Sequence, residues 1–221
     1  MIELKNITKV FTPNKLEKIT ALKDVNLHIK KGELVVLKGA SGSGKSTILS
    51  LIAGLSKPTF GEVVVNQQKV SKLVDDFASM FRRQNIGFVF QKYNLIPNLT
   101  VEENIITPLI PTNPNKNELE QKLLKVLKKF EIESKREIKV KSLSGGEQQR
   151  VAISRALINN PPIIIADEPT ANLDEKLSLD FIQIVRSLKD EGKTILIATH
   201  DPLFFELDFV DRVVEINHGK I

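Results

Sequence analysis

Two glycine-containing stretches of this chain could each hold a phosphate group. The first is "GASGSGKST", residues 39–47, which matches the pattern G-x-x-x-x-G-K-[ST] from Gly39 to Ser46. The apolar run "LVVLKG" leads into it and a helical pattern follows it, which is the context in which this pattern binds a nucleotide. The second is "LSGGEQQR", residues 143–150, where two glycines lie at the start of a predicted helix. The sequence therefore predicts two anion-binding helix starts on one chain.

The first stretch predicts how a nucleoside triphosphate is bound. Its glycines let backbone N–H groups surround phosphate oxygens, Lys45 supplies a positive charge for the β- and γ-phosphates, and the Ser46 hydroxyl can ligate Mg²⁺. The alternative is a Gly/Ser-rich loop with an unrelated lysine, which the flanking strand and helix disfavour. The predicted nucleotide-binding residues here are Gly39, Ala40, Ser41, Gly42, Ser43, Gly44, Lys45, Ser46 and Thr47.

Two adjacent acids end the apolar run "IIIADEP" and suggest hydrolytic chemistry. Asp167 can hold the Mg²⁺ shell, as a strand-end aspartate does in nucleotide hydrolases with this phosphate loop. Glu168 is then free to polarise an attacking water, because a general base must lie near the γ-phosphate without being tied up by the metal. The alternative is an acidic strand end that merely faces solvent, which is a costly use of a strand of isoleucines.

Three further groups complete the candidate site. Gln91 and His200 each end an apolar strand, and the Gln91 amide could bind Mg²⁺ or the attacking water, although either residue alone is more typical of a loop or a structural position. In the second stretch Ser144, Gly145 and Gly146 offer a hydroxyl and unhindered N–H groups at a positive helix end. The same stretch also fits a capping box, Ser144 with Glu147, and both interpretations can hold together.

The elements that must position these groups follow from hydrophobic periodicity. Alternating or continuous apolar runs predict strands at 2–8, 22–29, 34–39, 63–66, 86–91, 163–169 and 194–200, and a closing hairpin at 213–221. Helical spacing predicts helices at 45–53, 117–130 and 175–191, and one from "LSGGEQQR" to the prolines of "NNPP". Strands that alternate with helices around a parallel core predict an α/β fold of two lobes.

The composition limits the alternatives. A chain of 221 residues with 41% hydrophobic and 27% charged residues is typical of one compact unit, and the absence of cysteine excludes disulfides and thiolate metal sites. The net charge of +5 fits a solvated lysine-rich surface better than a nucleic-acid or lipid-binding one. The start "MIELKNITKV" is typical of a strand and not of a signal peptide, and no apolar run approaches the roughly 20 residues needed to cross a bilayer.

Taken together, these motifs resemble the nucleotide-binding subunit of ATP-binding cassette (ABC) transporters, over nearly the whole chain. They occur in the family's order: Walker A at 39–46, the Q-loop at Gln91, the signature at 143–147, Walker B at 163–167 followed by Glu168, the D-loop "ANLD" at 171–174, and the switch histidine His200. The resemblance implies a P-loop NTPase fold with a RecA-like parallel core, an antiparallel β subdomain and an α-helical subdomain. It further implies a single domain over 1–221, with a catalytic lobe at 1–91 and 161–221 and a helical lobe at 92–160.

The resemblance also implies a function. It implies an ATPase that uses ATP and Mg²⁺, with Glu168, His200 and Gln91 catalytic, Ser46, Gln91 and Asp167 around the metal, and Phe11 stacked on adenine. Ser144, Gly145 and Gly146 would grip ATP held by a second copy of the chain in a head-to-tail homodimer.

Residues 82–105 resemble the lipoprotein-release, macrolide-export and cell-division branch of the family, which implies export or mechanotransmission. Transmembrane permease subunits would hold the protein at the cytoplasmic face of the cell membrane. The segment after Gln91 would contact them, with Tyr93, Leu95 and Pro97 as candidate contact residues. That segment could equally pack inside the helical lobe. The alternative function is a soluble ABC ATPase that acts on nucleic acid or ribosomes, but such relatives carry two cassettes or long coiled coils, so no nucleic acid is expected.

Overall fold

The strands form two sheets, one parallel and one antiparallel. The structure is a computed structural model and describes residues 1–14, 17–171 and 173–221. The strands are β1 Ile2–Asn14, β2 Glu17–Ile29, β3 Leu34–Lys38, β4 Phe60–Val65, β5 Gln68–Lys69, β6 Ile86–Val89, β7 Ile163–Asp167, β8 Thr194–Thr199 and β9 Arg212–Glu215.

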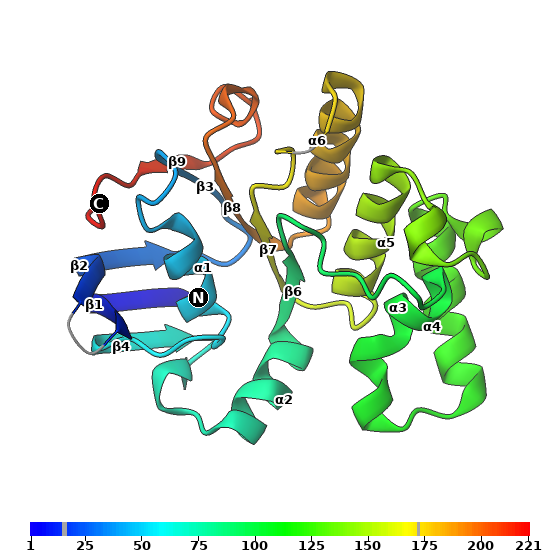
Figure 1. The fold of residues 1–221 in the computed structure, drawn as a ribbon, viewed down its shortest axis with the longest axis horizontal. Coiled ribbons are helices and arrows are strands. Elements are labelled where there is room, and N and C mark those ends of the chain that lie inside the picture. Colours follow the sequence, from blue (N-terminus) through cyan, green and yellow to red (C-terminus); the bar gives the residue numbers. More distant parts are fainter. Residues whose placement is uncertain (15–16, 172) are drawn as a thin grey trace.

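The parallel sheet lies at the centre of the molecule and has the order β6-β7-β8-β3-β9 (Figure 1). Its middle strands are continuous apolar runs because helices or the second sheet cover both faces; every residue of β8 is buried. Along β3, Leu34 and Val36 face one hydrophobic cluster, whereas Val35 and Leu37 face the other. All five strands run the same way, so the loops after β3, β6, β7 and β8 emerge at one edge of the sheet.

The antiparallel sheet has the order β2-β1-β4-β5 and packs at one side of the parallel sheet, across helix α1 (Lys45–Ile52) (Figure 1). Its inward residues, such as Ile2, Leu4 and Ile7, share a cluster with Ile48 and Leu49 of α1. The antiparallel sheet therefore supports the helix that begins at Lys45.

The helices on the other side of the parallel sheet form a second lobe (Figure 1). Its helices have clear start signals, since Thr100 with Glu103 and Ser144 with Glu147 form capping boxes and Asn115 is an N-cap. Outside this lobe, Asp174 is the N-cap of the helix that begins at Glu175. The α-helices after α1 are α2 Asp75–Asn85, α3 Val101–Ile106, α4 Lys116–Lys129, α5 Gly145–Leu157 and α6 Glu175–Asp190. The short 3₁₀ helices are η1 Val70–Lys72, η2 Thr107–Thr112, η3 Glu133–Lys135, η4 Val140–Ser142 and η5 Pro202–Phe204.

The α/β fold, with its parallel core, antiparallel sheet and helical part, is confirmed, and one local prediction is wrong. Residues 213–221 do not close the chain as a hairpin, because β9 pairs in parallel with β3 at the edge of the central sheet and only an isolated bridge joins Asn217 to Lys220. Alternating apolar residues fit an exposed edge strand as well as a hairpin arm, so periodicity could not separate the two. Helix α2, with acids in its first turn and arginines in its last, was not predicted.

Within the described residues, no helix is both long and apolar enough to span a membrane.

Candidate functional site

The phosphate loop connects β3 to α1, and its glycines are required by shape. A Cβ on Gly39 would lie 2.4 Å from the Ile216 carbonyl oxygen, and one on Gly44 would lie 2.8 Å from the Ala21 carbonyl oxygen. Gly44 also has φ +111°, in the region that favours glycine. The loop is thus held between the end of β9 and the β2 strand.

Lys45 is buried at the start of α1 and folds back into the loop. Its ammonium donates to the carbonyl oxygens of Gly39 at 2.7 Å and Ala40 at 3.1 Å. It also lies 3.2 Å from Oε1 of Glu168, which follows β7. The cation that the sequence assigns to the phosphates therefore faces two loop carbonyls and one carboxylate.

Glu168 connects Lys45 to the next strand end. Its backbone has φ +44°, and its N–H donates to the carbonyl oxygen of Ala198 in β8 at 2.8 Å. Its Oε2 lies 3.0 Å from Nδ1 of His200 and accepts from the His200 N–H at 3.3 Å. Glu168 is 11% exposed and His200 66% exposed, so the carboxylate lies in the interior and the imidazole faces outward. The left-handed backbone at Glu168 is a local strain that aims its carboxylate between these two partners.

Ser46 and Asp167 form the oxygen-rich part of the site. The Ser46 hydroxyl donates to Oδ1 of Asp167 at 2.9 Å. Burial, with a smaller contribution from the Glu168 charge, raises the pKa of Asp167, and the Ser46 hydrogen bond and Lys45 oppose this rise. A hydroxyl and a carboxylate at this spacing are hard oxygen ligands, and they fit a Mg²⁺ ion that takes its remaining ligands from phosphate and water.

The remaining predicted residues lie apart from this cluster or at its edge. Gln91 is exposed two residues beyond the end of β6. Phe11 lies on β1, is 42% exposed, and has the Lys9 ammonium 4.8 Å from its ring centroid. In the D-loop, Asn172 lies outside the described residues, and Asp174 accepts from the Leu177 N–H as the N-cap of α6. The adenine role of Phe11 stays a prediction.

The second glycine stretch begins α5. The Ser144 side chain accepts from the Glu147 N–H at 3.4 Å, and the Glu147 carboxylate accepts from the Ser144 N–H at 2.8 Å and from its hydroxyl at 3.0 Å. The capping box is thus confirmed. Gly145 has open space where a Cβ would stand, whereas a Cβ on Gly146 would lie 2.7 Å from Leu177 Cδ2.

Gln149 was not predicted from the sequence. It connects the helix that follows the second glycine stretch to the segment after Walker B. Its side chain is 4% exposed and donates to the Pro169 carbonyl oxygen at 3.0 Å, which fixes α5 against the segment after Walker B. Nothing in the motif distinguishes this glutamine from its neighbour Gln148.

Comparison with known proteins identifies the family of this chain. The sequence model of the ABC transporter family matches residues 22–171. The chain is 47% identical to the uncharacterized ABC transporter ATP-binding protein MJ0796 of Methanocaldococcus jannaschii, over all of this chain and 95% of that protein. The chain belongs to the ABC transporter family. It is an ATP-binding subunit of this family, and its enzyme class is ATPase.

Other relatives refine the position of this ABC cassette. It is 42% identical to the macrolide export ATP-binding/permease protein MacB of Campylobacter jejuni, over all of this chain but only 33% of MacB, so it spans about a third of that protein. A dimeric post-hydrolysis structure of MJ0796 bound to ADP and Pi superposes with a TM-score of 0.91 at 46% identity, covering 100% of this chain and 96% of that one. The structure of cbiO1 of Clostridium perfringens, part of the ABC transporter complex cbiONQ, superposes with a TM-score of 0.84 at 28% identity. The match covers 99% of this chain and 85% of that one.

Proposed function

We propose that two copies of this ABC cassette bind two ATP molecules between them, head to tail, and hydrolyse them to move a membrane permease. One observation carries the proposal. Lys45, Ser46, Asp167, Glu168 and His200 converge at one edge of the parallel sheet, whereas the second anion-binding start, at Ser144, belongs to α5 of the helical part and has open space at Gly145. A site of this kind suits a phosphate brought by another subunit, and the MJ0796 cassette on which this chain superposes is dimeric and bound to ADP and Pi.

Each residue then has a role in hydrolysis. Lys45 would leave the loop carbonyls for the phosphates, and Ser46, Asp167 and Gln91 would hold Mg²⁺, which neutralises charge on the phosphate oxygens when bound. Glu168 would take a proton from the attacking water, and His200, hydrogen-bonded to it, would orient that carboxylate. The catalytic lobe would comprise residues 1–91 and 161–221, and the helical lobe would comprise residues 92–160.

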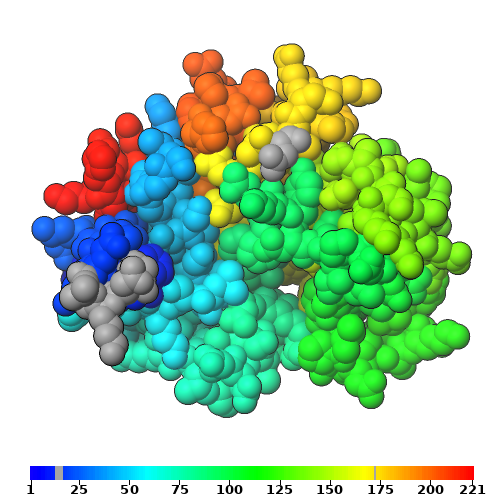
Figure 2. Space-filling model, in the orientation of Figure 1, coloured from blue at the N-terminus to red at the C-terminus, as the bar shows by residue number. Residues whose placement is uncertain are grey.

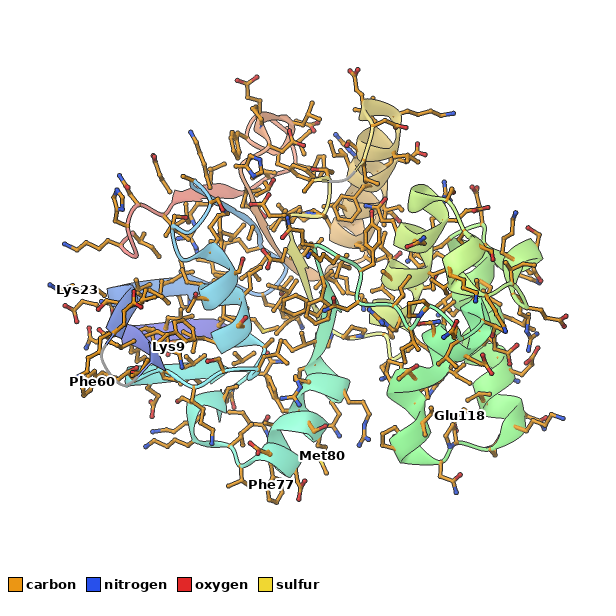
Figure 3. The ribbon with its side chains drawn as sticks, in the orientation of Figure 1. Lys9, Lys23, Phe60, Phe77, Met80 and Glu118 are labelled. Carbon is orange, nitrogen blue, oxygen red and sulfur yellow. The ribbon has the colours of Figure 1, made fainter. Side chains whose placement is uncertain are left out.

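The permease would dock in the hollow between the two lobes, which Figure 2 shows between the teal and green parts of the chain. A cavity of about 300 Å³ lies there between α2, β6, η2 and α5. Its walls include the stacked rings of Phe88 and Phe90, and Leu55 and Ile110 are exposed nearby. Phe77 and Met80 also point outward from α2 beside it (Figure 3). An apolar hollow with apolar side chains exposed around it is typical of a protein docking site.

Two of the candidate contacts after Gln91 suit a packing role instead. Tyr93 is 8% exposed and Leu95 packs against the large core cluster, whereas Pro97 is exposed. We therefore assign permease contact to the cavity walls and to Pro97. The similarity to macrolide export ATP-binding/permease proteins supports export, and mechanotransmission and a place at the cytoplasmic face of the membrane are part of the proposal.

The dimer is tested with a variant that binds ATP but cannot hydrolyse it. Glu168→Gln should elute as a dimer in sizing chromatography with Mg-ATP and as a monomer without it. Adding Ser144→Arg should abolish the dimer while leaving ATP binding by the monomer intact. Loss of monomer binding in the double variant would show instead that Ser144 serves its own chain's nucleotide.

The docking site is tested by cross-linking in cells of the source organism. A photo-reactive amino acid at Ile110 should capture a protein with membrane spans, whereas the same group at the exposed Ile19 of β2 should not. Capture of a ribosomal protein or of nucleic acid at Ile110 would favour the alternative function.

A further inference from the structure

The turn that follows Gln91 has an unusual backbone. Tyr93 has φ +57° and Asn94 has φ +48°, so two consecutive residues other than glycine adopt the left-handed conformation. Asparagine tolerates this region, but a bulky residue such as tyrosine rarely occupies it. The Tyr93 hydroxyl is also buried and has no hydrogen-bond partner within the part of the chain that the structure describes. Such a turn needs support from outside to persist.

Arg155 of α5 supplies that support. Its Nη2 donates to the Tyr93 carbonyl oxygen at 2.5 Å, and its Nη1 donates to the Asn94 carbonyl oxygen at 2.6 Å. The planar fork of the guanidinium thus bridges the two carbonyls of the strained turn, an arrangement that a lysine ammonium cannot reproduce. The rest of the segment is anchored separately, since Asn104 of α3 bonds both the N–H and the carbonyl oxygen of Ile96.

The surroundings of Arg155 distinguish it from the other arginines of the helical part. Arg136 and Arg150 each form an ion pair with a carboxylate. Among the described residues Arg155 has no ion pair, and burial lowers its pKa. A guanidinium that is desolvated without an anionic partner is unfavourable, so its two carbonyl bonds must offset that cost.

We infer that Arg155 is a positioning residue that fixes the turn at Tyr93 and Asn94 and thereby sets the place of Gln91 for ATP hydrolysis. The inference rests on the proposed role of Gln91. Arg155 lies on the helix that begins at Ser144 and also lines the cavity proposed for the permease. One side chain therefore links the partner's phosphate contact, the docking cavity and the residue beside the metal.

The test compares Arg155→Ala with Arg150→Ala, a control on the same helix. Arg150 also donates to a main-chain carbonyl, that of Phe130, at 3.0 Å, but does not contact the turn. Arg155→Ala should lower kcat at least fivefold with KM for ATP within twofold of wild type, because the triphosphate contacts remain. The kcat of Arg155→Lys should lie between those of Arg155→Ala and the wild type. Arg150→Ala should leave kcat within twofold.

A direct reading of the turn separates positioning from general stability. In hydrogen exchange, the amides of Tyr93 and Asn94, which bond to the Phe90 and Lys92 carbonyls, should exchange faster in Arg155→Ala, and that of Ile96 should not change. Asn94 is exposed, and alanine is disfavoured at its φ of +48°. Asn94→Ala should therefore speed exchange at the turn and lower kcat while leaving Arg155 unchanged.

Unchanged exchange at the turn, or faster exchange with kcat within twofold, would overturn the inference. If Arg155→Ala is too unstable to assay, Asn94→Ala decides alone. A fully active Gln91→Ala would instead refute the proposed role of Gln91, and the exchange measurement does not depend on that role.

Discussion

The Lys45 ammonium and the Glu168 carboxylate lie 3.2 Å apart, with side chains only 5% and 11% exposed. The cation proposed for the phosphates therefore pairs with the proposed general base. A triphosphate bound at the loop would compete with the Glu168 carboxylate for the Lys45 ammonium. The Glu168 charge would also repel the γ-phosphate.

Glu168→Gln should consequently bind ATP several-fold more tightly than the wild-type chain while its hydrolysis rate falls by a factor of about 10² or more. Calorimetry with ATP and a phosphate-release assay measure the two effects. Glu191→Gln, which removes a surface carboxylate paired with Lys129, is the control and should change neither. Weaker ATP binding by Glu168→Gln would refute the competition between carboxylate and phosphate.

The strands and the site residues of this chain were predictable for different reasons. Strands β3, β7 and β8 are largely apolar runs that are followed directly by Gly39, Glu168 and His200. Their parallel pairing and common edge therefore follow from pattern. The pairing of Glu168 with Lys45 does not follow from pattern, because it depends on a left-handed backbone at a glutamate.

Arg155 and Gln149 were missed for a related reason. Both lie on α5, where the spacing of the apolar residues makes them ordinary polar positions. Their hydrogen-bond partners are main-chain carbonyls 62 and 20 residues away in sequence. Carbonyl groups carry no side-chain signal, so only the folded chain reveals such pairs.

Gly145→Ala should separate stability from dimer formation. Apart from its chain neighbours and the backbone of its own helix, no atom of the described residues lies within 4 Å of a Cβ at this position. Alanine favours the helix over glycine by up to about 1 kcal/mol, so the thermal midpoint should hold or rise. The added methyl group would occupy the approach of the partner's phosphate, so ATP-dependent dimerisation should weaken at least tenfold. Sizing chromatography in the Glu168→Gln background measures this.

Gly146→Ala provides the contrast. Its Cβ would lie 2.7 Å from Leu177 Cδ2, so α6 or the leucine must shift and the free chain should lose stability. Truncating the neighbour, as Leu177→Ala, should recover part of that loss. Equal thermal midpoints for the two glycine variants would contradict the packing described for the start of α5.

The capping box should give α5 an acid-dependent stability. The Ser144 N–H, and then the Lys135 ammonium, hold the pKa of Glu147 below its ordinary value. Because the folded pKa is lower than the unfolded value of about 4.3, this stabilisation is complete above that value and is lost as the pH falls through the folded pKa. Glu147→Gln keeps a capping oxygen but removes the charge, and should cost about 0.3–1 kcal/mol near pH 7.

Denaturant unfolding at several pH values measures that cost. The difference between wild type and Glu147→Gln should shrink as the pH is lowered from about 6 to about 3. A difference independent of pH would mean that the carboxylate charge does not contribute.

Ser46→Ala should raise the Mg²⁺ concentration that half-saturates ATP hydrolysis by roughly tenfold. The Ser46 hydroxyl is a proposed Mg²⁺ ligand, and it also holds the Asp167 carboxylate, a second proposed ligand, through a hydrogen bond. Titrating Mg²⁺ at saturating ATP measures it. Thr59→Ala removes a threonine hydroxyl that bonds Val10 in the antiparallel sheet and should leave that concentration unchanged. An unaltered Mg²⁺ requirement in Ser46→Ala would remove Ser46 from the metal shell.

The separation of Lys45 on α1 from Ser144 on α5 has a genetic consequence. In a head-to-tail pair each nucleotide draws Lys45 from one chain and Ser144 from the other, so a Lys45→Ala copy beside a Ser144→Arg copy would put both defects into one site and leave the other intact. Two inactive alleles should then complement each other when expressed together. Two alleles that are both altered at Lys45 should not.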